Sequence, residues 1–413
     1  MAKAVVLHHY WNEPGGGELV CSSTAIALKA MGFDPVLASP MKIDVSKYPQ
    51  WYGISLEDFE TYSYPIDLKA FGIYLRLFVG NVGKRAAEKF NAEIVFSDEA
   101  TSRRALKELR ERGIETIEYI HFPLEAAVNE DYRKKGYFYG NDPYILERYG
   151  RFPMNLYWWV YKKILPQFTG INPFDASNLV LTNSSWTGNI VREVYGEKPT
   201  VLNPPIPPSM EIVERPRDFE EREKSVVMIG RYSEEKRYHW VIEEVLPRLL
   251  REDPEIRLYI IGSSSTPHSR AYVSRLMKLA GSMGIKISEK EECSESICLL
   301  LNAPSELKLK IMDRSRVFMH ATVNEHWGIA VAEAMARGIP AVIHRSGGAW
   351  SDLAEDGRNA LGYMDGDEAA DAVLRLMNNE GEWRRLSRAS VERVKELNLK
   401  EYARKLGELL KKI

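Results

Sequence analysis

The sequence is poor in cysteine and glutamine and lacks long apolar runs. Three cysteines, Cys21, Cys293 and Cys298, occur among 413 residues; they are too few for a disulfide scaffold and their spacing fits no zinc site. We predict free thiols in a reducing cytoplasm, while Cys293 and Cys298 lie near enough in sequence to pair. No run of ~18 apolar residues occurs, which argues against a membrane span. The apolar run at the N-terminus is also too short for a signal peptide.

The net charge gives no support to a nucleic-acid-binding function. The formal net charge is −2, which gives no electrostatic argument for nucleic-acid binding, since that usually needs a basic surface. Glutamine occurs only at Gln50 and Gln167, while Asp, Glu, Lys and Arg make up 28% of the chain. This balance is typical of hyperthermophile proteins, and we predict a thermophilic source.

Along the chain, short β-branched runs alternate with longer amphipathic stretches. This pattern is typical of α/β folds with parallel sheets. The length favours two or three domains. The expected strands are Ala4–His8, Val36–Ala38, Ile94–Phe96, Thr116–Ile120, Leu179–Leu181, Thr200–Leu202, Ser225–Ile229, Leu258–Ile261, Val317–His320 and Ala341–His344.

A proline-rich segment divides the chain. Four of the five residues from Pro204 to Pro208 are prolines, which can continue neither a helix nor a central strand. We predict one domain over residues 1–203, a linker over 204–224, a second domain over 225–396, and a C-terminal helix over 397–413 that packs back on the first domain. Ligands of open parallel sheets bind at the carboxyl ends of the strands, so we expect the site there.

Glycines follow the first strand at Gly15, Gly16 and Gly17. They allow close backbone approach to a phosphate at a helix N-terminus, but a plain turn is an equal interpretation. After the strand that opens the second half, Arg231 and Lys236 follow Gly230. Together they could bind one anion, Arg231 through a forked, bidentate contact and Lys236 as a mobile point charge. Two solvated surface cations would have the same sequence pattern.

Another candidate lies between Asn324 and Glu333. Glu325 precedes a helix that we expect to begin near Gly328, so the amides of Gly328, Ile329 and Ala330 would face an anion. Glu333, farther along this helix, could accept hydrogen bonds from a ribose diol. The alternative is an ordinary helix N-terminus with a favourable acidic residue nearby.

Three further segments contain candidate functional residues. His121, at the end of a strand, could bind a substrate or relay a proton, although a lone histidine is more often structural. Asp365 and Asp367 are interpreted as helix capping residues and not as a metal site. The aromatic, lysine-bearing stretch Tyr157–Leu165 suits either a helix packed on the first domain or one at a membrane surface.

Taken in this order, the segments resemble glycosyltransferase family 4. The most specific parts are the G-R-x-x-x-x-K element at Gly230–Lys236 and the E-x7-E element at Glu325–Glu333. The resemblance implies two facing Rossmann-like domains, the GT-B architecture, with an interdomain cleft. Within this family, the chain looks most like the lipid-linked-oligosaccharide α-1,2-mannosyltransferases of the N-glycan pathway, on the segments His9–Glu18, Tyr119–Pro123, Thr182–Thr187 with Asn203–Pro205, and Asn324–Gly328.

That resemblance implies a retaining, metal-independent hexosyltransferase that needs no cofactor and uses a nucleotide sugar, GDP-mannose by best match. The acceptor would be a glycan or a polyprenyl-diphosphate-linked glycan, reached in the cytoplasm with peripheral contact at the membrane face. The implied catalytic residues are His121, Glu325, Arg231 and Lys236. The implied donor-binding residues are Gly16, Gly17, Arg231, Lys236, Glu325, Gly328, Ile329, Ala330 and Glu333. A non-catalytic nucleotide-sugar-binding protein and a sugar-nucleotide epimerase of the same architecture are the alternatives.

Overall fold

The computed structural model describes residues 1–64, 72–137, 150–290 and 293–413, and these form two compact units. The first unit contains a parallel sheet of seven strands in the order β3-β2-β1-β4-β5-β6-β7. These strands are β1 (Lys3–Leu7), β2 (Asp34–Ser39), β3 (Glu60–Ser63), β4 (Ala92–Ser97), β5 (Glu115–Ile120), β6 (Leu179–Thr182) and β7 (Thr200–Val201).

Helices cover both faces of this first sheet. The chain leaves β1 in one direction along the sheet and β4 in the other, so right-handed crossovers place the connecting helices on opposite faces. The helices are α1 (Gly16–Ala30), α2 (Tyr48–Tyr52), α3 (Gly72–Leu75), α4 (Val79–Phe90), α5 (Arg103–Arg110), α6 (Leu124–Val128), α7 (Glu130–Lys134), α9 (Met154–Ile164), α10 (Pro166–Thr169), α11 (Pro173–Ala176), α12 (Ser185–Tyr195) and α20 (Leu399–Leu410).

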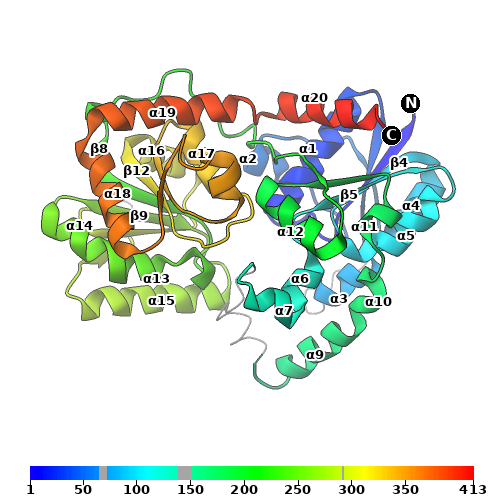
Figure 1. Cartoon of the computed structure of the whole chain (residues 1–413), viewed down its shortest axis with the longest axis horizontal. Coiled ribbons are helices and arrows are strands. Elements are labelled where there is room, and N and C mark those ends of the chain that lie inside the picture. The colour runs from blue at the N-terminus through cyan, green and yellow to red at the C-terminus, as the bar shows by residue number, and fades with distance from the viewer. Residues whose placement is uncertain (65–71, 138–149, 291–292) are drawn as a thin grey trace. The chain divides into compact units, whose positions relative to one another are not determined.

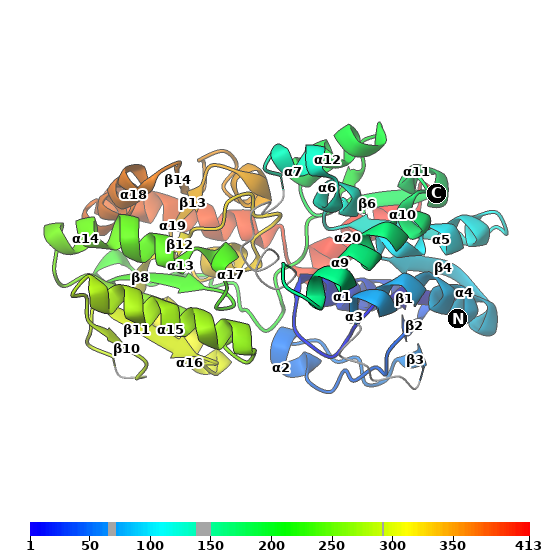
Figure 2. The same cartoon turned by 90° about the horizontal axis from the view of Figure 1, so that it is seen from below.

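The second unit repeats this design with the strand order β10-β11-β9-β8-β12-β13-β14, again all parallel. Its strands are β8 (Glu223–Ile229), β9 (Arg257–Gly262), β10 (Ile287–Ser288), β11 (Ile297–Leu301), β12 (Ser315–His320), β13 (Ala341–His344) and β14 (Leu361–Tyr363). Two helical layers enclose this sheet (Figures 1 and 2), built from α13 (Tyr238–Trp240), α14 (Leu246–Glu252), α15 (Pro267–Ser282), α16 (Ser305–Arg314), α17 (Ile329–Ala336), α18 (Gly366–Asn378) and α19 (Glu380–Lys395).

The predicted α/β class with two Rossmann-like sheets is confirmed. Each expected strand is present, with ends that differ by one or two residues, and four strands were missed: β3, β10, β11 and β14. The first helix begins at Gly16, directly within the glycine run that follows the first strand. Asp365 caps α18, because its side chain accepts a hydrogen bond from the Glu368 amide, as predicted.

The first unit is discontinuous in sequence. It combines the described residues between Met1 and Met210 with Leu397–Ile413, while the second unit covers Glu211–Glu396. The division after Met210 falls within residues 204–224. Helix α20 lies along α1 (Figure 1), where the Tyr402 and Thr24 hydroxyls are 2.8 Å apart.

One buried arginine, Arg222, links helix ends to the second sheet. Arg222 is 3% exposed and donates to the carbonyls of Met312 and Ser315 at the end of α16 and to that of Arg337 after α17. Met312 and the C-caps Ser315 and Arg337 lie at helix C-termini, where carbonyl groups carry partial negative charge. The guanidinium therefore satisfies several helix ends at once.

The cysteine prediction was wrong for one pair. Cys293 and Cys298 form a disulfide, because the turn before β11 brings their Cα atoms to 5.8 Å; Cys21 is free and buried. Among the described residues, no helix combines the length and the apolarity that a membrane span requires.

Candidate active site

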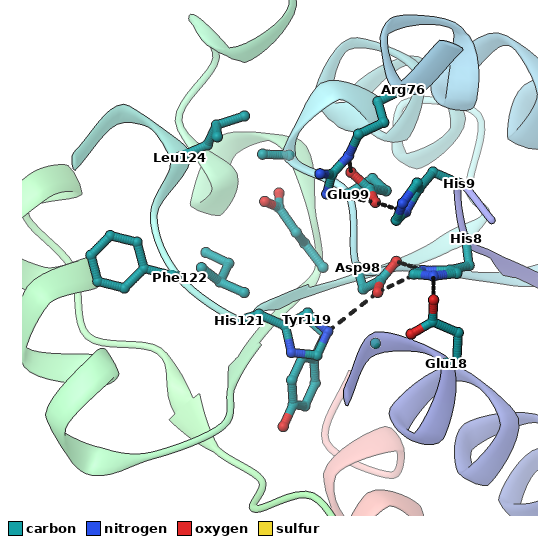
Figure 3. Close-up of a pocket in the computed structure, with 14 residues that line it drawn as sticks. His8, His9, Glu18, Arg76, Asp98, Glu99, Tyr119, His121, Phe122 and Leu124 are labelled. Carbon is teal, nitrogen blue, oxygen red and sulfur yellow. Dashed lines mark hydrogen bonds and ion pairs between the residues drawn. The ribbon is translucent and has the colours of Figure 1, made fainter. Parts of the chain in front are cut away.

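The first candidate site lies where three neighbouring strands of the first sheet end. His8 follows β1, Asp98 follows β4 and His121 follows β5, and in sheet order these strands are adjacent. Their side chains converge on a pocket of about 210 Å³ (Figure 3). A parallel sheet thus brings together polar residues that are far apart in sequence, at the edge where such sheets bind ligands.

Asp98 is the centre of this cluster. Its Oδ2 lies 2.8 Å from Nδ1 of His8 and 3.2 Å from Nε2 of His121, and its side chain is 2% exposed. Burial opposes charge on both Asp98 and His8, but their mutual attraction outweighs it: the pKa of His8 is raised well above its usual value and the pKa of Asp98 is lowered well below its own. They form an ion pair at neutral pH.

A second ion pair lies on the other side of the pocket. Arg76 donates to both oxygens of Glu99, at 3.0 and 3.2 Å, and Nδ1 of His9 lies 2.5 Å from the same carboxylate. Burial opposes ionisation of Glu99, but the guanidinium overcomes it and lowers the pKa of Glu99 to about 2. Burial and then the Arg76 charge lower the pKa of His9.

Gly17 lies directly against the Asp98 cluster. A Cβ atom there would come within 2.8 Å of His8 Cε1 and 2.9 Å of Asp98 Oδ2. Only glycine therefore lets the first turn of α1 approach these side chains. Gly16 is also in that turn, and the preceding Gly15 is held through its N–H and carbonyl by the Tyr52 hydroxyl.

The donor atoms of two groups lie close enough together to hold a metal ion: His8, Cys21 and Asp98, and His8, His9 and Glu99. In both groups a cation already neutralises the carboxylate, His8 beside Asp98 and Arg76 beside Glu99. We therefore assign no metal to either group.

The second candidate site lies at the carboxyl edge of the second sheet. Glu325 receives a hydrogen bond from Lys236 Nζ at 2.9 Å and lies 3.0 Å from His320 Nε2; both contacts are to its Oε2 atom. Burial opposes ionisation of Glu325, but Lys236 and then His320 overcome it and hold the pKa of Glu325 well below its usual value. Burial lowers the pKa of His320, so a neutral imidazole donates Nε2–H to the carboxylate.

The backbone around Glu325 is held by the loop after β13. Gly347 has a φ of +77°, and a Cβ atom there would come within 2.3 Å of the Glu325 carbonyl oxygen. The Gly348 amide donates to the same carbonyl at 2.7 Å. Gly328 has a φ of +93° and is the N-cap of α17, so Ile329 and Ala330 form the first turn of this helix as expected.

The remaining predicted residues are less closely gathered. Glu333 pairs with Lys308 of α16 at 3.1 Å. The Arg231 side chain is 77% exposed, and its ion pair in the described structure is with Glu235 at 3.5 Å. The structure thus joins Lys236 to Glu325, but it does not bring Arg231 to the same anion. Gly16, Gly17 and His121 belong to the first unit and the other predicted residues to the second.

Sequence reasoning missed several residues of both sites, namely His8, His9, Glu18, Arg76, Asp98, Glu99 and His320. His8, Asp98 and His320 share one signal, because each ends or directly follows an apolar strand. That signal becomes specific only with the strand order, which identifies the residues that are neighbours.

Comparisons with known proteins relate the sequence and the fold of this chain to glycosyltransferases. Residues 210–393 match the family model described as glycosyl transferases group 1. A GDP-Man:Man(3)GlcNAc(2)-PP-Dol alpha-1,2-mannosyltransferase of Candida glabrata is 30% identical over 181 residues, covering 43% of this chain and 34% of the relative. The enzyme of the same description from Eremothecium gossypii is 25% identical over 242 residues, covering 58% and 39%. The chain thus spans less than half the length of these curated relatives.

Solved structures share the fold. A crystal structure of Anabaena HepE in complex with UDP and glucose superimposes with a TM-score of 0.65 at 14% identity, covering all of both chains. Sucrose-phosphate synthase from Thermosynechococcus elongatus gives 0.66 at 15% identity, covering 100% of this chain and 99% of that one. The resemblance found in the sequence is confirmed. Residues 210–393 of this chain are thus similar to the glycosyl transferases of group 1.

Proposed function

We propose that this chain is a retaining hexosyltransferase that moves mannose from GDP-mannose to a lipid-linked glycan. The observation that carries the proposal is the Lys236–Glu325 pair beside the first turn of α17, inside the segment that matches the family model. The printed names of the mannosyltransferase relatives support the donor and the acceptor class, and retention follows from the family resemblance.

The pair suits a nucleotide-sugar donor. An ammonium group has three donor hydrogens, so Lys236 can keep Glu325 and still bind a diphosphate oxygen. Lys236 and His320 both contact Oε2 of Glu325, which leaves Oε1 to accept hydrogen bonds from sugar hydroxyls. Glu325 would thus orient the sugar, and Lys236 would stabilise the leaving diphosphate.

The neighbouring groups would bind the rest of the donor. The amides of Gly328, Ile329 and Ala330 at the start of α17 would bind phosphate oxygens, as helix N-termini do. Arg231, whose side chain is 77% exposed, would add a second cation. Glu333 would hold the ribose hydroxyls. Preorganised donors of this kind each account for about 10²–10³ in rate, which is the scale of the contribution expected from Lys236.

The first unit would supply the acceptor side. His121 lines the polar pocket beside Asp98 and would contact the transferred sugar and the attacking hydroxyl. We propose that Gly16 and Gly17 let the ligand approach the first turn of α1.

Binding of the donor is tested by thermal shift with GDP-mannose, UDP-glucose and ADP-glucose. A ligand at 100 times its dissociation constant adds about 2.7 kcal/mol of stability, so GDP-mannose should raise the melting temperature most. Lys236→Ala should abolish that shift, while Lys310→Ala, at an exposed lysine on α16, should retain it. A larger shift with another nucleotide sugar would overturn the choice of donor.

Catalysis is tested with GDP-[14C]mannose and a polyprenyl-diphosphate-linked glycan. We expect an α-linked product by NMR and the same turnover with and without EDTA, because cations of the protein perform the charge stabilisation. Nucleotide release without acceptor would support an epimerase or a hydrolase. Binding without turnover would support a non-catalytic protein, and loss of activity in EDTA that Mn²⁺ restores would overturn metal independence.

A lipid-linked acceptor requires contact with a membrane surface, and we assign that contact to α9. This helix forms an outer edge of the first unit (Figures 1 and 2). Tyr161 on one side is buried with Leu77 and Leu165, whereas Leu156 and Trp159 are more than half exposed. Lys162 and Lys163 follow on the same helix. Aromatic and aliphatic side chains beside lysines suit the interface of an anionic bilayer.

Vesicle flotation tests this assignment. The wild-type chain should float with vesicles containing 30 mol% anionic phospholipid, and Leu156→Ser with Trp159→Ser should reduce the bound fraction several-fold, because each buried CH₂ contributes about 0.8 kcal/mol. Met277→Ser, at an exposed residue of the second unit, is the matched control. Equal flotation of both variants would exclude α9 as the contact.

A further inference from the structure

The cluster around Asp98 contains a chain of ion pairs and hydrogen bonds that ends at His121. It runs from Glu18 at the start of α1 to His8, then to Asp98 and on to His121 (Figure 3). Nε2 of His8 lies 3.5 Å from Glu18, and the side chains of His8 and Asp98 are 3% and 2% exposed. Three elements thus supply a connected set of charges to one imidazole.

The positions of the protons follow from the acceptors. An ionised carboxylate only accepts hydrogen bonds, so both histidine nitrogens that face Asp98 must carry a hydrogen. His8 faces Asp98 through Nδ1, has the Glu18 carboxylate 3.5 Å from Nε2 and has a pKa well above its usual value, so it is an imidazolium at neutral pH. His121 carries its hydrogen on Nε2, and in its neutral form Nδ1 is the free acceptor.

We propose that Asp98 and His8 are positioning residues for His121. Asp98 holds the His121 proton on Nε2 and so presents Nδ1 to a substrate hydroxyl in the pocket, while the imidazolium of His8 offsets the charge of Asp98. This inference rests on the proposed function only for the identity of that hydroxyl, which is one of the transferred sugar or of the acceptor.

The other charges around the pocket do not replace Asp98 in this role. Glu118, on the same strand as His121, is paired with Arg103 at 2.9 Å. Glu99 is paired with Arg76. The groups that face His121 and its two partners from the surrounding elements are Glu18, Cys21, His9, Arg76, Glu99, Glu118 and Tyr119.

Gly17 allows His8 and Asp98 to lie together against the first turn of α1. Its missing side chain leaves the space in which His8 and Asp98 meet, since a Cβ atom would lie within 3 Å of both. The first turn of α1 can therefore pack against this pair only with glycine at position 17.

The test is ¹H–¹⁵N NMR of the full chain labelled at histidine nitrogens. The His121 ring signals are identified by their absence in His121→Asn. In the wild type we expect the Nε2–H tautomer. In Asp98→Asn and in His8→Asn the Nδ1–H tautomer should gain population, because the first variant removes the carboxylate that accepts from Nε2–H and the second removes the imidazolium that keeps Asp98 ionised.

Glu99→Gln is the matched control. It removes another buried carboxylate beside a histidine of the same pocket, and it should change the His9 signals while His121 keeps its Nε2–H tautomer. Circular dichroism confirms that each variant is folded. If His8→Asn does not fold, His8→Gln is measured in its place. The tautomer of His121 in the wild type tests the inference even without a His8 variant.

Kinetics separate positioning from structure. Asp98→Asn should lower kcat about 10²-fold, the lower end for general acid–base contributions, with little change in KM for the donor, and its pH–rate profile should change shape. A wild-type Nδ1–H tautomer, or an unchanged Nε2–H tautomer in both charge variants, would overturn the inference. If transfer from GDP-mannose fails while the tautomer is as expected, the proposed function fails and the inference stands.

Discussion

Replacement of Lys236 by methionine tests the electrostatics of the second site directly. The change removes the cation 2.9 Å from Glu325 while keeping most of the aliphatic side chain. The two side chains are 19% and 15% exposed, so the pair lies between a fully buried pair, whose disruption costs about 3–5 kcal/mol, and a surface pair at about 0–1 kcal/mol. We expect Lys236→Met to lower the free energy of unfolding of the second unit by ~2–3 kcal/mol.

The loss should depend on pH with a defined sign. The pKa of Glu325 is depressed in the folded chain, so its ion pair contributes stability that is fully present above the unfolded value of about 4.3. This contribution is lost as the pH falls through the depressed folded pKa. The penalty of Lys236→Met should therefore be largest at pH 6–7 and shrink below about pH 4.

Urea denaturation of four chains measures the effect: the wild type, Lys236→Met, Glu325→Gln and the double variant. In the Glu325→Gln background, Lys236→Met should cost much less, which gives a coupling free energy of at least about 1.5 kcal/mol at pH 7. A coupling below about 0.5 kcal/mol, the limit of ordinary additivity, would refute the view that the ion pair stabilises this site. A penalty that grows in acid would refute the sign.

Three further outcomes are expected. Arg231→Ala should lower turnover by about 10²–10³ without changing the urea midpoint, because its side chain is 77% exposed; turnover near that of the wild type would remove Arg231 from the site. Arg103→Met should cost about 3–5 kcal/mol in urea denaturation, since it leaves the buried Glu118 and its neighbour Glu125 without their guanidinium; a loss under 1 kcal/mol would contradict this. Asp365→Ala should cost about 1 kcal/mol through loss of the α18 cap, and an unchanged midpoint in urea would show that the cap contributes nothing.

The sequence predicted most of the strands because they are buried on both faces. Runs such as Val5–Leu7 and Val226–Ile229 are apolar throughout, as central parallel strands are. Strand β3 was missed because it is a half-exposed edge strand with the polar sequence Glu-Thr-Tyr-Ser. The run Ile297–Leu301 was overlooked because it follows a stretch of serines and glutamates that suggests a loop.

The candidate sites were predicted unevenly for a similar reason. Residues within one local segment, such as Glu325 and Gly328–Ala330, can be recognised from their spacing to a helix start. Asp98 is 90 residues from His8 and 23 from His121, and only the order β1-β4-β5 shows that they meet. The partnership of Lys236 with Glu325 depends likewise on the pairing of β8 with β12.

The passage of the chain through both units has a consequence for biosynthesis. A ribosome completes residues up to Met210 first, yet the first unit also needs Leu397–Ile413, which emerge only after the second unit. Until then the face of α1 that receives Tyr402 beside Thr24 stays uncovered. A nascent chain would therefore finish its second unit while its first waits for its final helix. A premature stop near residue 396 would leave that unit exposed to chaperones and proteases.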